Sequence, residues 1–166
     1  MKRHAMNGDQ EDFDRPDHAG VRVPPPLIFL VFLGGGIWLD SAWIAGAFAP
    51  LPWMIAGGCL LAAGLALIVL AGVGHFAAGT HVEPWKPTSA IVSSGLYAHS
   101  RNPMYLGMAL GQVGVAAAAG SLIGALSVVF SVAVVQWYVI GREERYLEAK
   151  FGQPYLDYKR RVRRWI

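Results

Sequence analysis

The sequence predicts an all-α integral membrane protein with about four transmembrane helices and a helical C-terminal segment outside the membrane. Three observations predict this class. The 166-residue chain is 54% hydrophobic and 15% charged, which is too apolar for a soluble domain of this size. Its apolar runs approach the about 20 residues that a helix needs to cross a bilayer. Its basic residues also lie only in those segments outside the apolar runs that the topology places on one side of the membrane.

The expected spans cover residues 27–43, 53–76, 103–119 and 121–141. The first contains Asp40 near its far end, and a charge at mid-membrane would cost about 2.5 to 3.5 kcal/mol. We therefore expect Asp40 at the membrane interface. Only Gly120-Ser121 separates the last two spans, so a tight turn should make them an antiparallel helical hairpin.

All fourteen Lys and Arg residues fall on one side of this topology. Four lie in the N-terminal tail, Lys86 and Arg101 lie in the middle loop, and eight follow from Arg142 onward. Basic residues concentrate in cytoplasmic segments, so both termini and the loop 75–102 should face the cytoplasm. The same arrangement explains the basic pI of about 9.2 without a nucleic-acid partner.

Residues 1–23 are expected to form a disordered cytoplasmic tail, and residues 24–166 one membrane domain. The single Cys59 excludes a disulfide framework built from this chain alone. Gly107, Gly111 and Gly114 form a small-residue stripe where helix backbones can approach closely. Packing within the chain is favoured over a dimer contact there.

Two polar stretches interrupt the apolar background, residues 81–105 and 142–158. Asn102 followed by Pro103 is typical of an N-cap and first helical residue. The free N–H groups of such a helix start, next to Arg101, could bind a carboxylate or phosphate. Structural capping alone is the alternative.

Glu143 and Glu144 lie just past the apolar part of the last span, where a helix C-terminal end favours cations over anions. Acids kept there point to a cationic or hydroxylated ligand; the alternative is a solvated face paired with Arg142 or Lys150. Tyr97 and Tyr105 could attract a cation such as a sulfonium, or serve as interfacial anchors.

The remaining chemistry of the polar stretches is limited. His75, His81 and His99 lack the spacing of a helix-borne metal site, so we expect no metal. No Ser or Cys lies in a recognisable nucleophile motif, which argues against covalent hydrolysis. The sequence therefore assigns no catalytic residue.

Together these stretches resemble the isoprenylcysteine carboxyl methyltransferase family and its relatives among the phospholipid methyltransferases. The likeness covers residues 51–166, as expected of a short bacterial-type member. Its specific motifs are Ser94-Gly95-Leu96-Tyr97, Arg101-Asn102-Pro103-Met104-Tyr105, Glu143-Glu144, and Phe151-Gly152 with Tyr155 and Tyr158.

The resemblance implies an S-adenosylmethionine-dependent methyltransferase whose C-terminal segment closes over a cytoplasmic cofactor pocket in a bacterial inner membrane. Carried over to this sequence, the cofactor contacts fall on Ala90, Ile91, Val92, Tyr97, Asn102, Pro103, Met104, Tyr105 and Glu143, joined by Glu144 and by the neighbouring Arg101. Asn102 replaces the usual His of the family. Val139 stands where the eukaryotic enzymes carry a substrate-linked arginine, which weakens the case for a prenylcysteine acceptor.

The expected acceptor is a lipophilic small molecule that enters from the membrane lipid. A carboxylate acceptor would need no base, so the absence of an obvious base leans towards an acid or a thiol. Two other functions remain: an NADPH-dependent membrane reductase of the sterol-reductase type, and a non-catalytic membrane protein. Arg160, Arg161, Arg163 and Arg164 would supply the reductase's phosphate clamp, but we interpret them as an interfacial basic strip with Trp165 and Ile166 as anchors.

Overall fold

The computed structural model describes residues 17–43 and 49–166, and no β-strand occurs among them. The helices that it contains are α1 (Pro25–Trp43), α2 (Leu51–Ala77), η1 (Gly95–Ala98), α3 (Pro103–Ala118), α4 (Leu122–Leu126), α5 (Val128–Val134), η2 (Val135–Ile140), α6 (Gly141–Phe151) and α7 (Gln153–Arg161). Here η1 is a 3₁₀ turn and η2 is a π-helical stretch. From α4 to α6 the chain is one long rod, Leu122–Phe151.

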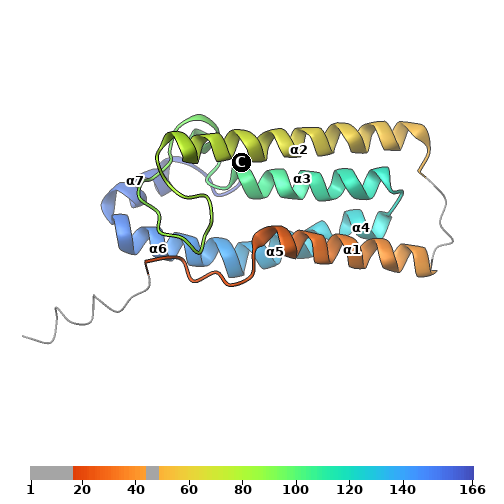
Figure 1. Ribbon diagram of the computed structural model, residues 1–166, viewed down its shortest axis with the longest axis horizontal. Coiled ribbons are helices and arrows are strands. Elements are labelled where there is room, and N and C mark those ends of the chain that lie inside the picture. The colour runs from red at the N-terminus through yellow and green to blue at the C-terminus, as the bar shows by residue number, and fades with distance from the viewer. Residues whose placement is uncertain (1–16, 44–48) are drawn as a thin grey trace, which may run out of the picture.

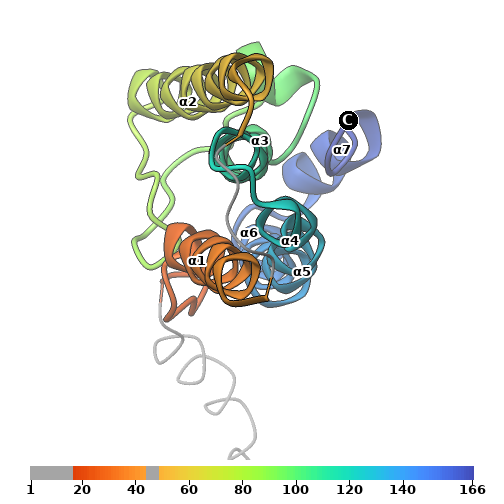
Figure 2. The ribbon, with the colours of Figure 1, turned by 90° about the vertical axis from the view of Figure 1, so that its right-hand side faces the viewer.

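The long helices lie side by side along one axis (Figure 1). Seen along that axis, α3 lies between α2 on one side and α1 with α4 on the other (Figure 2). Three of them, α1, α2 and the rod Leu122–Phe151, are long and apolar enough to cross a membrane. The chain is therefore an integral membrane protein. The third expected span is α3, which has 16 residues and a length of about 24 Å.

Helices α2 and α3 are in contact through glycines. A Cβ atom added to Gly64 would lie 2.5 Å from Gly107 O, and one added to Gly57 would lie 2.5 Å from Gly114 O. Only Gly57, Gly64 and Ala71 are buried on α2, so most of this helix faces away from the protein. The small-residue stripe thus packs within the chain, as the sequence predicted.

A tight turn joins α3 to α4, also as predicted. Gly120 has φ +70°, and the Ser121 hydroxyl accepts a hydrogen bond from Gly124 N to cap α4. Asp40 accepts hydrogen bonds from the Ser121 hydroxyl and, at 2.9 Å, from Ile123 N. It therefore lies at the end of the bundle opposite the basic residues, where it satisfies donors at the start of α4.

The polar side chains between α3 and α5 are paired with one another. Gln112 Nε2 donates to Ser127 Oγ over 2.8 Å, and Ser131 Oγ donates to Gln112 Oε1 over 2.7 Å. An unpaired amide among apolar helices would cost several kcal/mol. This network therefore holds the two helices in one register.

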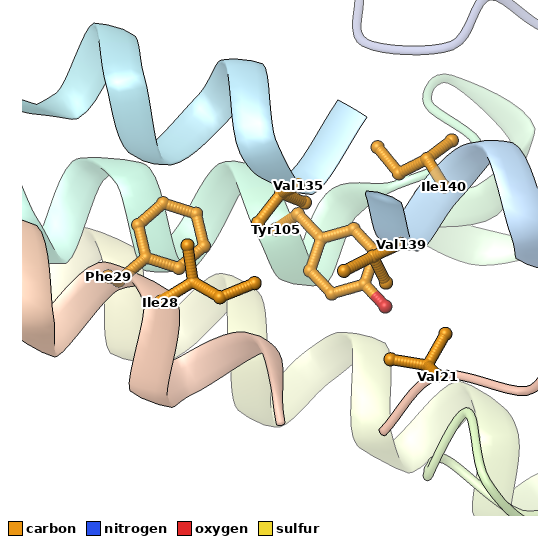
Figure 3. Packing of buried hydrophobic residues seen from close by; sticks show 7 residues of the cluster. All are labelled: Val21, Ile28, Phe29, Tyr105, Val135, Val139 and Ile140. Carbon is orange, nitrogen blue, oxygen red and sulfur yellow. The ribbon is translucent and has the colours of Figure 1, made fainter. Parts of the chain in front are cut away.

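The predicted tail of residues 1–23 is wrong for residues 17–23, which we call the N-terminal strap; residues 1–16 lie outside the described ranges. Val21 is 2% exposed and belongs to a cluster with Tyr105, Val135 and Val139, as Figure 3 shows. Arg142 Nη1 donates to Gly20 O over 2.9 Å. Burial of Val21 and this bond order a segment whose composition alone suggested disorder.

We predict that Gly64→Ala lowers the free energy of unfolding by about 1 to 3 kcal/mol, because the new methyl would overlap the backbone of α3. Chemical unfolding in detergent measures this. The control is Gly58→Ala on the same helix, where an added Cβ meets nothing within 4 Å. Equal unfolding of both variants would contradict the close contact.

Candidate functional site

One pocket opens at the end of the bundle that carries the basic residues. Its walls come from the strap, the end of α2, the loop before η1, the start of α3, and helices α6 and α7. The lining residues are Ala19, His75, His81, Val82, Glu83, Pro84, Thr88, Ala90, Ile91, Val92, Tyr97, Arg101, Asn102, Met104, Tyr105, Ile140, Glu143, Glu144, Tyr146, Leu147, Tyr155 and Tyr158.

Ten of the eleven residues that the sequence selected line this pocket. The exception is Pro103, the first residue of α3, which is fully buried and starts the helix. Sequence reasoning missed His75, Tyr146, Leu147 and the strap residue Ala19. Tyr155 and Tyr158 were noted only as motif positions, although both line the pocket.

Glu143 and Tyr105 meet in the pocket. The Tyr105 hydroxyl donates to Glu143 Oε1 over 2.6 Å, joining the start of α3 to the start of α6. No Lys or Arg in the described ranges forms an ion pair with Glu143. The π-helical stretch η2 ends directly before α6, and such stretches are frequent beside functional sites. A carboxylate with spare acceptor capacity therefore faces the pocket.

Glu144, by contrast, is surrounded by cations. Arg101 Nη1 lies 3.0 Å from Oε1, and Arg164 binds both oxygens, with Nε at 3.0 Å and Nη2 at 2.6 Å. Lys159 Nζ lies 3.7 Å from Oε2. The alternative of a solvated face paired with Arg142 or Lys150 does not apply, because Arg142 binds the strap and Lys150 Nζ lies 2.5 Å from Asp17. Glu144 is only 6% exposed, so it is a buried ionic centre.

Arg101 retains hydrogen-bonding capacity. Its side chain is 9% exposed, yet neither Nε nor Nη1 makes a hydrogen bond with a described residue. Nη1 is close to Glu144 but does not direct its N–H at it. Buried guanidinium donors without partners are costly, so this residue is suited to an anionic group in the pocket.

The C-terminal residues 162–166 are tied to the start of α3. Arg101 N donates to Arg163 O over 3.0 Å, and Asn102 Nδ2 donates to Arg164 O over 2.8 Å. Asn102 occupies the N-cap position, but its side chain makes no cap hydrogen bond. The predicted N-cap position is confirmed, but the side-chain amide holds the tail instead of capping the helix.

The same tail removes Arg164 from the expected basic strip, because it pairs with Glu144. Arg160, Arg161 and Arg163 are exposed. Trp165 Nε1 donates to Gln136 Oε1 over 2.6 Å, which turns the indole towards η2. Only Ile166 remains fully exposed among the expected anchors.

Four buried tyrosines surround the pocket: Tyr97, Tyr105, Tyr155 and Tyr158. Burial raises the pKa of Tyr155 to about 12 and raises the pKa of Tyr97 and Tyr158 further above the usual value. These three hydroxyls therefore stay protonated at neutral pH. Tyr158 donates to Tyr97 O over 2.8 Å, which fixes α7 against η1.

Tyr146 also lies at the pocket. Its hydroxyl accepts from Thr88 N over 3.0 Å and donates to Asp17 over 2.9 Å. The Lys150 contact and this hydrogen bond lower the pKa of Asp17. Tyr146 thus joins the strap to the loop that forms one pocket wall.

The arrangement suits a zwitterionic small molecule. Arg101 offers donors to an anionic group, whereas Glu143 and the faces of the tyrosines suit a cationic or hydroxylated group. Ile91, Val92 and Met104 add apolar walls. Fold and site together define an integral membrane protein with a tyrosine-lined pocket at the charged end of its bundle.

Comparison with known proteins identifies the family. The family model described as phospholipid methyltransferase matches residues 52–154, more than half of the chain. A 47-residue segment is 45% identical to an uncharacterized protein from Haemophilus influenzae, covering 28% of this chain and 75% of that protein. The chain belongs to the phospholipid methyltransferase family, as its motifs predicted, and this membership supports a membrane methyltransferase.

We predict that Glu144→Gln lowers the free energy of unfolding by about 3 kcal/mol, because three cations would lose their common counter-charge. The matched control is Glu148→Gln, which removes only a half-exposed contact with Lys159 and should cost less than about 1 kcal/mol. Denaturant titration in detergent distinguishes the two. Similar losses would show that Glu144 is an ordinary surface acid.

Proposed function

We propose that the protein is a membrane-embedded methyltransferase that uses S-adenosylmethionine and transfers its methyl group to a lipophilic small molecule entering from the bilayer. One observation carries the proposal. Eight residues of the segment 90–105 line one pocket together with Glu143, which is distant in sequence, and this pocket contains the unbonded guanidinium nitrogens of Arg101. Membership of the phospholipid methyltransferase family supports the same reaction type.

The residues present fit the cofactor. Arg101 Nε and Nη1 would bind the carboxylate of its methionyl part. The second oxygen of Glu143 would accept from ribose hydroxyls or face the positive centre, because Tyr105 occupies only Oε1. The tyrosine faces would stabilise the sulfonium by about 0.5 to 2 kcal/mol. When bound, the cofactor supplies an electrophilic methyl group to a nucleophile aligned with it.

The protein's own tasks are alignment and exclusion of water. The C-terminal residues 162–166 cover the start of α3 through backbone and side-chain hydrogen bonds, and α7 is fixed through Tyr158. Ile140, which lines the pocket, supplies a wall of low polarity, and Val135 and Val139 are buried in the same cluster behind it. Such a wall favours a reaction in which charge disperses at the transition state.

An apolar residue, Val139, stands where the resemblance places the substrate-linked arginine of the prenylcysteine enzymes. Val139 is 0% exposed and packs in the cluster with Val21, Ile28 and Tyr105. A carboxylate of the isoprenylcysteine type would have no positive partner at this position. The observation favours lipophilic acceptors other than prenylcysteine.

We also propose that the charged end of the bundle faces the cytoplasm of a bacterial cell, with both termini on that side of the inner membrane. Every Lys and Arg of the described ranges lies at that end, in the strap, the middle loop or the region after Ile140. Cytoplasmic segments carry such an excess of basic residues. Polar cofactor would then reach the pocket directly from the cytoplasm.

Calorimetric titration of the detergent-solubilised protein with S-adenosylhomocysteine and, separately, with NADPH tests the proposal. We expect binding of the first ligand alone. Binding of NADPH alone would favour a reductase, although Arg164 and Arg160 already pair with Glu144 and Asp157. Binding of neither ligand would favour a non-catalytic membrane protein.

A second prediction concerns the acid in the pocket. Glu143→Gln should weaken S-adenosylhomocysteine binding at least about tenfold, because an amide lacks the charge and one acceptor oxygen. Unfolding in detergent should change little, since no cation is left unpaired. Glu148→Gln, outside the pocket, is the control for affinity. Unchanged affinity in Glu143→Gln would remove this carboxylate from the binding site.

A further inference from the structure

A histidine that the proposed binding mode does not use lines the same pocket. His75 lies in the last turn of α2 and is half-buried. Its ring packs edge-on against Tyr97, with centroids 5.1 Å apart and an interplanar angle of 71°. η1 packs directly against this turn, since a Cβ added at Gly74 would be in van der Waals contact with the Tyr97 ring at 3.7 Å. The ring is therefore held in one orientation.

The hydrogen bond of the ring determines its tautomer. His75 Nδ1 lies 3.3 Å from Ala71 O. A carbonyl oxygen can only accept, so Nδ1 must carry the proton when this bond forms. In the neutral ring Nε2 is then an unprotonated acceptor, and no described residue donates a hydrogen bond to it. A neutral imidazole with a free Nε2 is a general base.

The other titratable and charged groups around the pocket are less suited. The free oxygen of Glu143 is a competing base, although the proposed binding mode assigns it to the cofactor, and the Glu143→Gln variant tests it. Tyr97, which touches His75, stays protonated because burial raises its pKa. Tyr105 donates to Glu143, and Glu144 is neutralised by cations including Arg101. The loop that closes this side carries His81 and Glu83, and Glu83 pairs with Lys86 at 2.6 Å. His75 is left as the base that packing has oriented.

We propose that His75 is a catalytic base that takes the proton from an amine or thiol acceptor during methyl transfer, a role that rests on the proposed function. The acceptor's nitrogen or sulfur forms a bond with the methyl carbon while the carbon–sulfur bond of the donor breaks. That bond's electron pair stays on the departing sulfur, which becomes a neutral thioether. The acceptor's proton passes to Nε2 and later to water.

This inference reverses the expectation drawn from the absence of a base. A carboxylate needs no deprotonation beyond its normal ionised state, whereas an amine or thiol must lose a proton to attack or to complete the reaction. A base in the pocket is useful only for the second class. The structure therefore points to an acceptor with an N–H or S–H group on a lipophilic tail.

The test uses dodecylamine, dodecanethiol and dodecanoate in proteoliposomes with methyl-labelled S-adenosylmethionine. These acceptors share one tail and differ only in the head group. We expect methylation of the amine or the thiol, and a fall in kcat of about 100-fold in His75→Gln. KM and S-adenosylhomocysteine affinity should change less than about threefold. The wild-type rate should fall at acidic pH as His75 becomes protonated, and His75→Gln should lose this inflection.

Several results would overturn the proposal. They are methylation of dodecanoate alone, an unchanged kcat in His75→Gln, loss of the inflection in Glu143→Gln instead, or cofactor binding without methylation of the amine or thiol. Absence of S-adenosylhomocysteine binding would instead overturn the proposed function. His99→Gln, at an exposed position outside the pocket lining, is the matched control and should keep the wild-type pH profile.

A spectroscopic measurement checks the tautomer independently of activity. The chain has five histidines, and nitrogen NMR of histidine-labelled protein, with His75→Gln for assignment, reports which ring nitrogen is protonated. At neutral pH we expect a proton on Nδ1 and none on Nε2. A proton on Nε2 would contradict the proposed base.

Discussion

The ion pairs of Glu144 are the interaction on which the pocket depends. One buried carboxylate binds Arg101 before α3, Lys159 on α7 and Arg164 in the C-terminal tail. Two buried charges cost more to desolvate than they gain unless their geometry is good, and here the Arg164 contact is bidentate. Because one acid contacts cations from all three segments, the segments that form the pocket are ordered together.

Glu143, the residue directly before Glu144 in the chain, has a different environment. Successive residues of a helix point about 100° apart, so Glu144 turns into the ionic cluster while Glu143 turns towards Tyr105 and the pocket. Glu144 holds the segments of the site together, whereas Glu143 keeps an oxygen for a ligand. Adjacent residues of one type can thus serve separate purposes because helix geometry separates them.

The apolar part of the molecule supports this arrangement. Glycine contacts hold α2 close to α3, and the Gln112 network joins α3 to α5. These contacts place the ends of α2, α3 and α6 together at one end of the bundle (Figure 1). Flexible loops alone would not hold His75, Tyr105 and Glu143 around one small pocket. The site is therefore precise because rigid helices carry these three side chains.

The sequence by itself determined the membrane class, the helix positions to within a few residues, the family and ten of the pocket's residues. These follow from local composition and from motifs that survive without knowledge of contacts. Only the tertiary structure decided that Asn102 binds the tail, that Trp165 reaches Gln136, and that the strap and His75 line the site. Each of these joins residues far apart in the chain, and pairings of that kind depend on how the helices pack.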